Sequence, residues 1–113
     1  MRLTVTAGDP RDPEATALLK ASHAYLQSLY DPEDNHFLSV DALCAPDILF
    51  FVAKLDERIV GTAALALREG YAEVKSMYVD PAARGRGVAK ALMERLMGEA
   101  GIRGLTELML ETG

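Results

Sequence analysis

VKSMYVDPAARGRGVAKAL, residues 74–92, decides the fold of this 113-residue chain. A run of strand-forming residues passes through a short loop containing Pro81 into a helix start that is interrupted by glycine. Small residues in such a turn let backbone N–H groups approach an anion at the positive end of a helix dipole. Arg84 and Arg86 add charge that complements a diphosphate. The stretch therefore predicts a turn that holds phosphate.

The same run resembles motif A of the GNAT superfamily of acyl-CoA-dependent N-acetyltransferases, which reads Arg/Gln-x-x-Gly-x-Gly/Ala after a strand and a loop. Here the motif positions are Arg84, Gly87 and Ala89. Residues 73–79 look like the family's fourth strand, and residues 80–83 look like the loop that follows it. Strand, loop, motif and helix occur together and in order, which makes the match more specific than glycines alone. The alternative is a structural turn with solvated arginines.

The resemblance implies direct transfer of an acetyl group from acetyl-CoA to a primary amine, with no metal. It also implies which residues contact the cosubstrate. Backbone groups near Met77, Tyr78 and Val79 are expected to bind pantetheine. The phosphate-binding residues are expected to be Arg84, Gly85, Arg86, Gly87, Val88 and Ala89.

Acetyl transfer sets two requirements on side chains. The amine attacks as the neutral base, so a residue or water has to remove its proton, and the tetrahedral oxyanion needs a preorganised donor. Glu73 lies at the start of the motif strand, where some family members place a carboxylate that acts through water, and it is our candidate base. The alternative is a strand-end glutamate that faces solvent. Tyr78 is a speculative general acid, and packing in the core or at its rim is the alternative.

Hydrophobic periodicity predicts the remaining elements. We expect a first strand at residues 3–6, a helix at 13–29, a short helix near 39–43, a hairpin of strands 48–54 and 59–67, and a strand ending at 79. A helix follows Gly87 and frays at Gly98 and Gly101, and residues 105–110 form a fifth strand parallel to the fourth. Gly61 marks a bulge. The fold class is α/β (α+β), a GNAT-like mixed sheet of four antiparallel strands and a parallel strand–helix–strand unit, in a single domain over residues 1–113.

GNAT domains normally continue beyond this point with another helix and two strands, which close one side of the cleft and often supply a tyrosine acid. The resemblance thus covers about the first two-thirds of a family domain, by a count of elements. A cut chain, completion by a partner and a shortened variant are all open. An unpaired fifth strand would be an exposed edge, so a homodimer through that edge is expected.

Composition excludes several classes of function. A net charge of −5 and a pI near 4.9 argue against binding to nucleic acid or to anionic membranes, which requires basic surfaces. Cys44 is the sole cysteine, so an intrachain disulfide and a cysteine-rich zinc site are excluded, and a reducing cytoplasm is the natural setting. His23 and His36 lack metal-ligand spacing. No segment is long and apolar enough to predict a membrane span.

Two further readings stay open. The acidic stretch 31–35 either faces a cationic substrate or is a solvated loop. The whole chain is either an acetyltransferase or a non-catalytic acyl-CoA-binding module of the same fold. A dinucleotide-binding domain is a poorer third option, because that fold places its glycine loop after the first strand.

Overall fold

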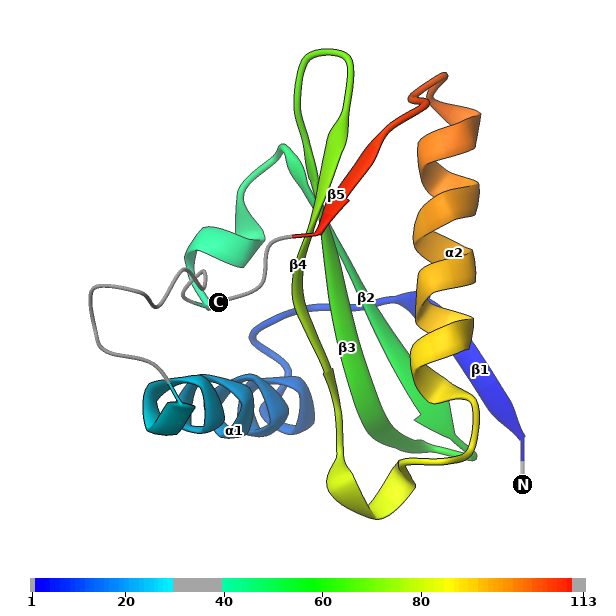
Figure 1. The fold of residues 1–113 in the computed structure, drawn as a ribbon. Helices are drawn as coiled ribbons and strands as arrows, with labels where there is room; N and C mark the ends of the chain where they lie inside the picture. Colours follow the sequence, from blue (N-terminus) through cyan, green and yellow to red (C-terminus); the bar gives the residue numbers. More distant parts are fainter. Residues whose placement is uncertain (1, 30–39, 111–113) are drawn as a thin grey trace.

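The computed structural model describes residues 2–29 and 40–110, which form a five-stranded sheet with helices on both faces (Figure 1). The strand order is β1-β2-β3-β4-β5. The strands are β1 (Leu3–Ala7), β2 (Ile48–Leu55), β3 (Arg58–Leu67), β4 (Ala72–Val79) and β5 (Leu108–Leu110). The helices are α1 (Pro13–Leu29) and α2 (Val88–Ile102), with 3-10 turns η2 (Ala42–Cys44) and η3 (Pro81–Ala83).

The topology confirms the predicted mixed sheet. Strands β1 to β4 pair antiparallel with their neighbours, whereas β5 pairs parallel to β4 after α2 has crossed between them. Two details of the sequence prediction were wrong. Residues 105–107 lie outside the fifth strand, and Gly98 and Gly101 lie within α2, which continues to Ile102. Of the short helix near residues 39–43, the described part shows one 3-10 turn.

Alternating side chains of the sheet build two separate cores. On β3, Leu65 is buried toward α2 and the adjacent Ala64 toward α1, both fully, as expected for a strand that is covered on both faces. The α2 core contains Phe51, Ala53, Ala63, Leu65, Ala72, Val74, Ala83, Val88, Leu92, Leu96 and Ala100. The α1 core contains Ala15, Leu19, Leu43, Phe50, Val52, Ile59 and Ala64.

Gly61 lets α2 approach the sheet closely. A Cβ atom at this position would lie 2.8 Å from Val88 Cγ1 and 3.1 Å from Leu92 Cδ1, nearer than packed carbon atoms come. The pairing of β2 with β3 also shifts register here, between Ala53 and Lys54, which confirms the predicted bulge. The first turn of α2 is therefore held directly against β3.

Candidate acyl-CoA site

Strand β4 contains a bulge that the sequence did not reveal. Thr62 pairs with Tyr78 but Ala64 pairs with Lys75, so two residues of β4, Ser76 and Met77, lie opposite one residue of β3. Ser76 has a φ of 52°, in the left-handed region that a side chain rarely adopts. The Thr62 hydroxyl donates a 3.0 Å hydrogen bond to the carbonyl oxygen of Ser76. The extra residue changes the direction of every group that follows it.

Two backbone hydrogen bonds reveal this change of direction. The amide of Ala72 donates to the carbonyl of Glu107 beside β5, at 3.1 Å, while the amide of Asp80 donates to Val60 on β3, at 2.8 Å. In a regular strand, residues an even number apart would face the same neighbour. The bulge reverses the alternation, so the amides of Met77 and Val79 face the β5 side and that of Tyr78 faces β3.

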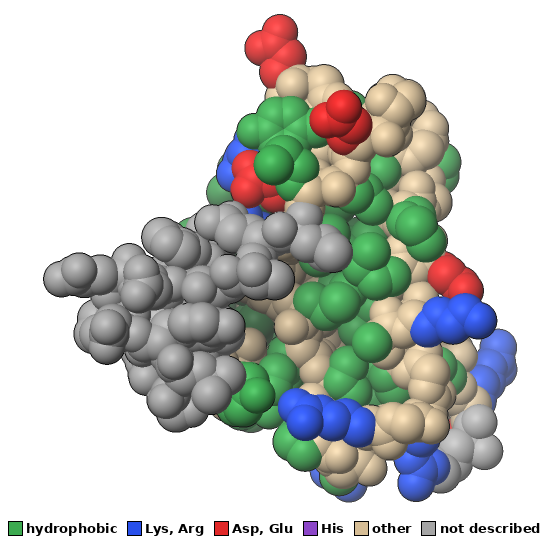
Figure 2. All heavy atoms as spheres, viewed as in Figure 1, with side chains coloured by type: hydrophobic (Ala, Val, Ile, Leu, Met, Phe, Trp, Pro, Cys, Tyr) green, Lys and Arg blue, Asp and Glu red, His purple; other side chains and the backbone are tan. Residues whose placement is uncertain are grey.

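Where these amides point, the β5 side of β4 has no partner strand in the described part of the chain. The described pairing of β5 covers residues 72–74 of β4 and ends at the Val74–Leu110 pair. Within the described ranges, no strand pairs with residues 75–79 on that side. Figure 2 shows hydrophobic side chains exposed along this face of the molecule, with basic side chains near its lower end. A ligand chain lying along β4 would therefore find apolar contacts and main-chain donors that no described strand pairs with.

The loop after β4 is fixed by its own backbone. The Asp80 carboxylate accepts a 3.0 Å hydrogen bond from the amide of Ala82 and caps η3, whose Ala83 is buried. Gly85 and Gly87 then adopt φ values of 82° and 78°. A Cβ atom at either position would meet nothing within 4 Å, so the left-handed backbone, not lack of space, favours glycine here. The surface above both glycines is open.

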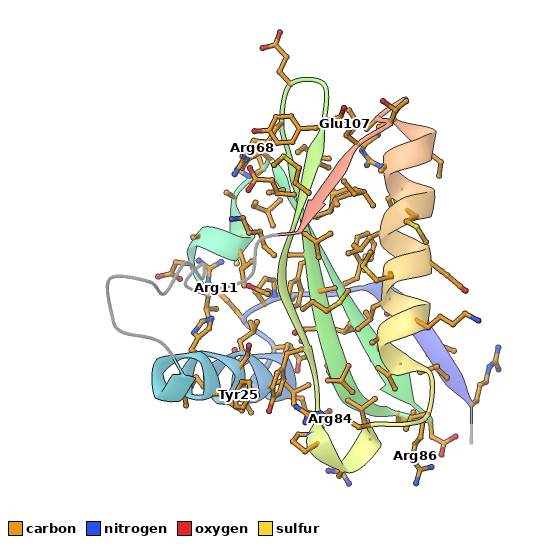
Figure 3. The ribbon with its side chains drawn as sticks, viewed as in Figure 1. Arg11, Tyr25, Arg68, Arg84, Arg86 and Glu107 are labelled. Carbon is orange, nitrogen blue, oxygen red and sulfur yellow. The ribbon has the colours of Figure 1, made fainter. Side chains whose placement is uncertain are left out.

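The start of α2 brings together the residues that the sequence predicted to contact phosphate. Gly87 is the N-cap residue and supplies no side-chain cap, while the first amides of a helix have no intrahelical acceptor. Val88 is buried and anchors this end, whereas Ala89 is exposed. Arg84 and Arg86 are exposed at the same end of the molecule (Figure 3). The structure thus brings together, at one helix N-terminus, every residue predicted to contact phosphate.

Glu73 is held by two cations. Its Oε2 lies 3.2 Å from Lys75 Nζ and its Oε1 lies 3.1 Å from Arg68 Nε. These contacts, the hydrogen bond from Lys75 first and that from Arg68 after it, lower the pKa of Glu73 below its ordinary value, against the opposing effect of burial. The carboxylate is therefore ionised at neutral pH and carries one ion pair on each oxygen.

The candidate residues of β4 divide between the two faces of the sheet. Met77 and Val79 pack against the α2 core, so the intervening Tyr78 presents its partly buried side chain to the α1 face. Before the bulge, Val74 belongs to the α2 core, which places the side chains of Glu73 and Lys75 on the α1 face as well. Glu73 and Tyr78 are therefore candidates for the acceptor side of the sheet.

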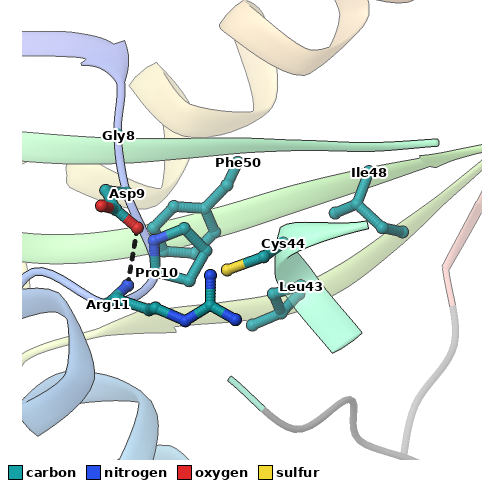
Figure 4. Close-up of a pocket in the computed structure, with 8 residues that line it drawn as sticks. All are labelled: Gly8, Asp9, Pro10, Arg11, Leu43, Cys44, Ile48 and Phe50. Carbon is teal, nitrogen blue, oxygen red and sulfur yellow. Dashed lines mark hydrogen bonds between the residues drawn. The ribbon is translucent and has the colours of Figure 1, made fainter. Parts of the chain in front are cut away.

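Cys44 lies apart from this site, in an open depression of about 290 Å³ (Figure 4). The depression is lined by Gly8, Asp9, Pro10, Arg11, Leu43, Cys44, Ile48 and Phe50. The thiol is free and donates to the carbonyl of Val40 at 3.4 Å, and Arg11 pairs with Asp41 at 3.0 Å. The acidic stretch 31–35 and His36 lie outside the described residues, and the segments that are described contain no cluster of three metal-ligating side chains.

The site thus consists of a strand whose β5 side has no described partner beyond Val74, followed by a loop with two glycines at a helix N-terminus. Comparison with known proteins shows which family has this arrangement. The model of the acetyltransferase (GNAT) family matches residues 14–113, so the chain belongs to that family, as the sequence predicted. No helix in the segments described has the length and apolar character needed to cross a membrane.

Several known acetyltransferases are similar to most of the chain. The chain is 40% identical over 113 residues to the IAA acetyltransferase of Azospirillum brasilense, and the match covers 98% of this chain and 74% of that protein. A structure from Klebsiella pneumoniae, described as an acyl-CoA N-acyltransferase, is 29% identical, with a TM-score of 0.77. The match covers 98% of this chain and 72% of that one. An acetyltransferase from Clostridium acetobutylicum, solved with acetyl-CoA, has the same fold at 18% identity and a TM-score of 0.69. The match covers 99% of this chain and 82% of that one.

Proposed function

We propose that this protein transfers the acetyl group of acetyl-CoA directly to a primary amine. One observation carries the proposal: beyond Val74, β4 has no partner on its β5 side among the described residues, and it leads through η3 into the glycine loop at the start of α2. That arrangement suits a long ligand with an anion at one end and a reactive group at the other. The naming of relatives as acetyltransferases, one of them solved with acetyl-CoA, supports it.

In this proposal the cosubstrate lies along β4. The amides of Met77 and Val79 bind the pantetheine arm. Tyr78, which lies between them, adds main-chain and side-chain contacts. The diphosphate lies over Gly85 and Gly87, at the amides of Val88 and Ala89, with Arg84 and Arg86 beside it. Backbone donors at a helix N-terminus and two guanidinium groups are the groups that bind phosphate oxygens in proteins.

The acetyl group then lies near the bulge, with the acceptor on the α1 face. The amine nitrogen attacks the thioester carbon, an adjacent main-chain amide donates to the oxyanion, and the carbon–sulfur bond breaks. Glu73 receives the amine's proton through a water molecule, and Tyr78 is the candidate acid that protonates the departing thiolate. A carboxylate with a lowered pKa is ready to accept a proton at neutral pH but is a weak base, so its placement matters more than its basicity.

Calorimetric titration with acetyl-CoA tests the cosubstrate site, with dephospho-CoA and NAD as comparison ligands and circular dichroism to confirm folding. We expect saturable binding to one site. Arg84→Ala should weaken it about 10-fold through loss of one charge-assisted hydrogen bond, and Gly87→Glu should abolish it by placing a carboxylate over the diphosphate.

The chain provides matched controls at the other end of α2. Arg103 is a surface arginine that pairs with Glu99 at 2.7 Å, and Gly104 has a φ of 71° with open space around it. Arg103→Ala and Gly104→Glu should leave binding unchanged. Equal losses in both sets, or a folded chain that ignores acetyl-CoA and binds NAD, would overturn the proposal.

A non-catalytic acyl-CoA-binding module is the second candidate, because both carboxylate oxygens of Glu73 are engaged by cations. Turnover with a panel of primary amines separates the two. Acetylated product, absent without acetyl-CoA, supports the enzyme; binding without turnover supports the module. A homodimer through the sheet edge and a cytoplasmic location stay predictions, which sedimentation velocity and cell fractionation would test.

A further inference from the structure

Arg68 joins three separate segments beside the candidate base. It lies at the end of β3, in the turn to β4, and its side chain is about one-third exposed, at 33%. Its Nη1 donates to Asp47 Oδ2 at 2.9 Å, ahead of β2, and to the carbonyl of Leu67 at 3.3 Å. Its Nε donates to Glu73 Oε1 at 3.1 Å. Nη1 is thus held by two acceptors, while Nε of the same planar guanidinium reaches Glu73.

Glu73 needs such a contact to have a defined orientation. Its neighbour on β3 is Ala66, which is too small to restrain a glutamate side chain, and its neighbour on β5 is Met109, whose thioether donates no hydrogen bond to a carboxylate. Lys75 contacts Oε2 from a flexible four-carbon stem on the same strand. Arg68 contacts Oε1, so the two cations together engage both oxygens and restrain the plane of the carboxylate. Each oxygen keeps a second lone pair that can accept a proton.

We propose that Arg68, anchored by Asp47, is a positioning residue that aims the Glu73 carboxylate at the water through which the acceptor amine loses its proton. In that step an N–H bond of the attacking amine breaks and an O–H bond to Glu73 forms, with the water passing the proton on. Arg68 touches neither substrate. The inference rests on the proposed function.

Among the described residues, the charged groups against Glu73 are Lys75, Arg68 and, through Arg68, Asp47. Loss of Arg68 should therefore have two effects that a purely structural residue would not produce. The carboxylate should become free to turn about Oε2, which lowers the rate of proton transfer. Its pKa should also rise, because one of the two cations that lower it is gone.

The experiment is a double-mutant cycle on acetyl transfer with Arg68→Gln and Glu73→Gln. We expect Arg68→Gln to lower kcat about 10-fold while the Kd for acetyl-CoA stays unchanged, since Arg68 is remote from the glycine loop. In the Glu73→Gln background, Arg68→Gln should not lower kcat further, because the effects of two residues that act through one group are not additive. Arg68→Lys should recover part of the rate, and ¹³C NMR should show a raised Glu73 pKa in Arg68→Gln.

Arg95→Gln is the matched control. Arg95 also contacts a glutamate through Nε, Glu99 at 3.1 Å, and also donates to a main-chain carbonyl, that of Val5 at 3.0 Å, but it lies on α2. It should lose stability without losing kcat. Two outcomes with an active wild type overturn this inference but leave the proposed function standing. In one, the kcat losses of Arg68→Gln and Glu73→Gln add in the double variant. In the other, Arg68→Gln and Arg95→Gln lose kcat equally. A wild type that acetylates no amine in the panel overturns the proposed function and this inference with it.

Discussion

Ser76 is a residue whose side chain the fold does not use. Its backbone is left-handed, and its hydroxyl oxygen is buried without a partner in the described part of the chain. The first feature costs about 1–2 kcal/mol in a residue with a side chain, and the second has a comparable cost. Ser76→Gly removes both, at the expense of a more flexible unfolded chain. We expect the free energy of unfolding to rise by about 1 kcal/mol in urea titrations.

Ser76→Val provides the contrast, since a β-branched side chain tolerates a positive φ poorly. It should destabilise the protein and broaden the amide signals of Met77 and Val79. A Ser76→Gly variant less stable than the wild type would show that the hydroxyl has a partner on which the fold depends.

The phosphate-binding residues could be predicted from sequence because their signal is local. Gly85 and Gly87 indicate a left-handed backbone, and the two arginines beside them indicate positive charge. Both features can be inferred without knowing any distant residue. The contact of Arg68 with Glu73 could not be predicted in this way. It depends on the register of β3 against β4 and on Asp47, 21 positions earlier in the chain, and no local pattern encodes either.

Helix α2 offers a test at the scale of an element, because it contains glycines in two backbone states. Gly98 lies within the helix, and a Cβ there would meet nothing within 4 Å. Gly98→Ala should raise the free energy of unfolding by about 1 kcal/mol through helix propensity. Gly87→Ala, at a φ of 78°, should lower it by about 1–2 kcal/mol. Thermal unfolding followed by circular dichroism measures both, and shifts of the same sign would contradict the assigned backbone states.

The same helix shows why some boundaries were mispredicted. Gly98 and Gly101 suggested a fraying end, yet Leu96 and Ala100 are buried against the sheet and hold this turn in place, so packing overrides propensity. The helix 13–29 was predicted correctly because Pro13 and the helical spacing of Leu18 with Ala21 give a strong local signal. Residues 105–107 look like strand, but pairing with β4 begins only at Leu108.

Gly61 tests the coupling between elements. Gly61→Ala introduces a Cβ 2.8 Å from Val88 Cγ1, so α2 has to move away from β3. Overpacking of this kind costs about 1–3 kcal/mol. Because Val88 anchors the helix N-terminus, acetyl-CoA binding should weaken together with stability, as calorimetry would show. Unchanged affinity in a destabilised variant would mean that the glycine loop keeps its position independently of helix packing.

At the scale of the whole molecule, the two faces of the sheet separate the two halves of the proposed reaction. The α2 face holds the helix N-terminus and the side chains of Met77 and Val79, while the α1 face holds Glu73, Lys75 and Tyr78. The bulge at Ser76 lies between the two sets of side chains, and it turns the main-chain amides of Met77 and Val79 toward the β5 side of the strand. A sheet covered by helices on both faces can therefore expose one strand edge to two substrates from opposite sides.

Two ion-paired glutamates, one on β4 and one on α2, should contribute to the loss of stability in acid. Arg103 first and Arg95 next lower the pKa of Glu99, and Lys75 and Arg68 lower that of Glu73. Each folded-state pKa lies below the unfolded value of about 4.3, so each pair contributes stability above that pH and loses it as pH falls through the folded pKa. Urea unfolding from pH 7 to pH 3 should show the free energy of unfolding falling below about pH 5.

Glu99→Gln should make the free energy of unfolding depend less steeply on pH in this range. Glu94→Gln, a change at an exposed position of the same helix, should leave the pH dependence as it is in the wild type. Equal pH dependence in both variants would contradict the role of Glu99.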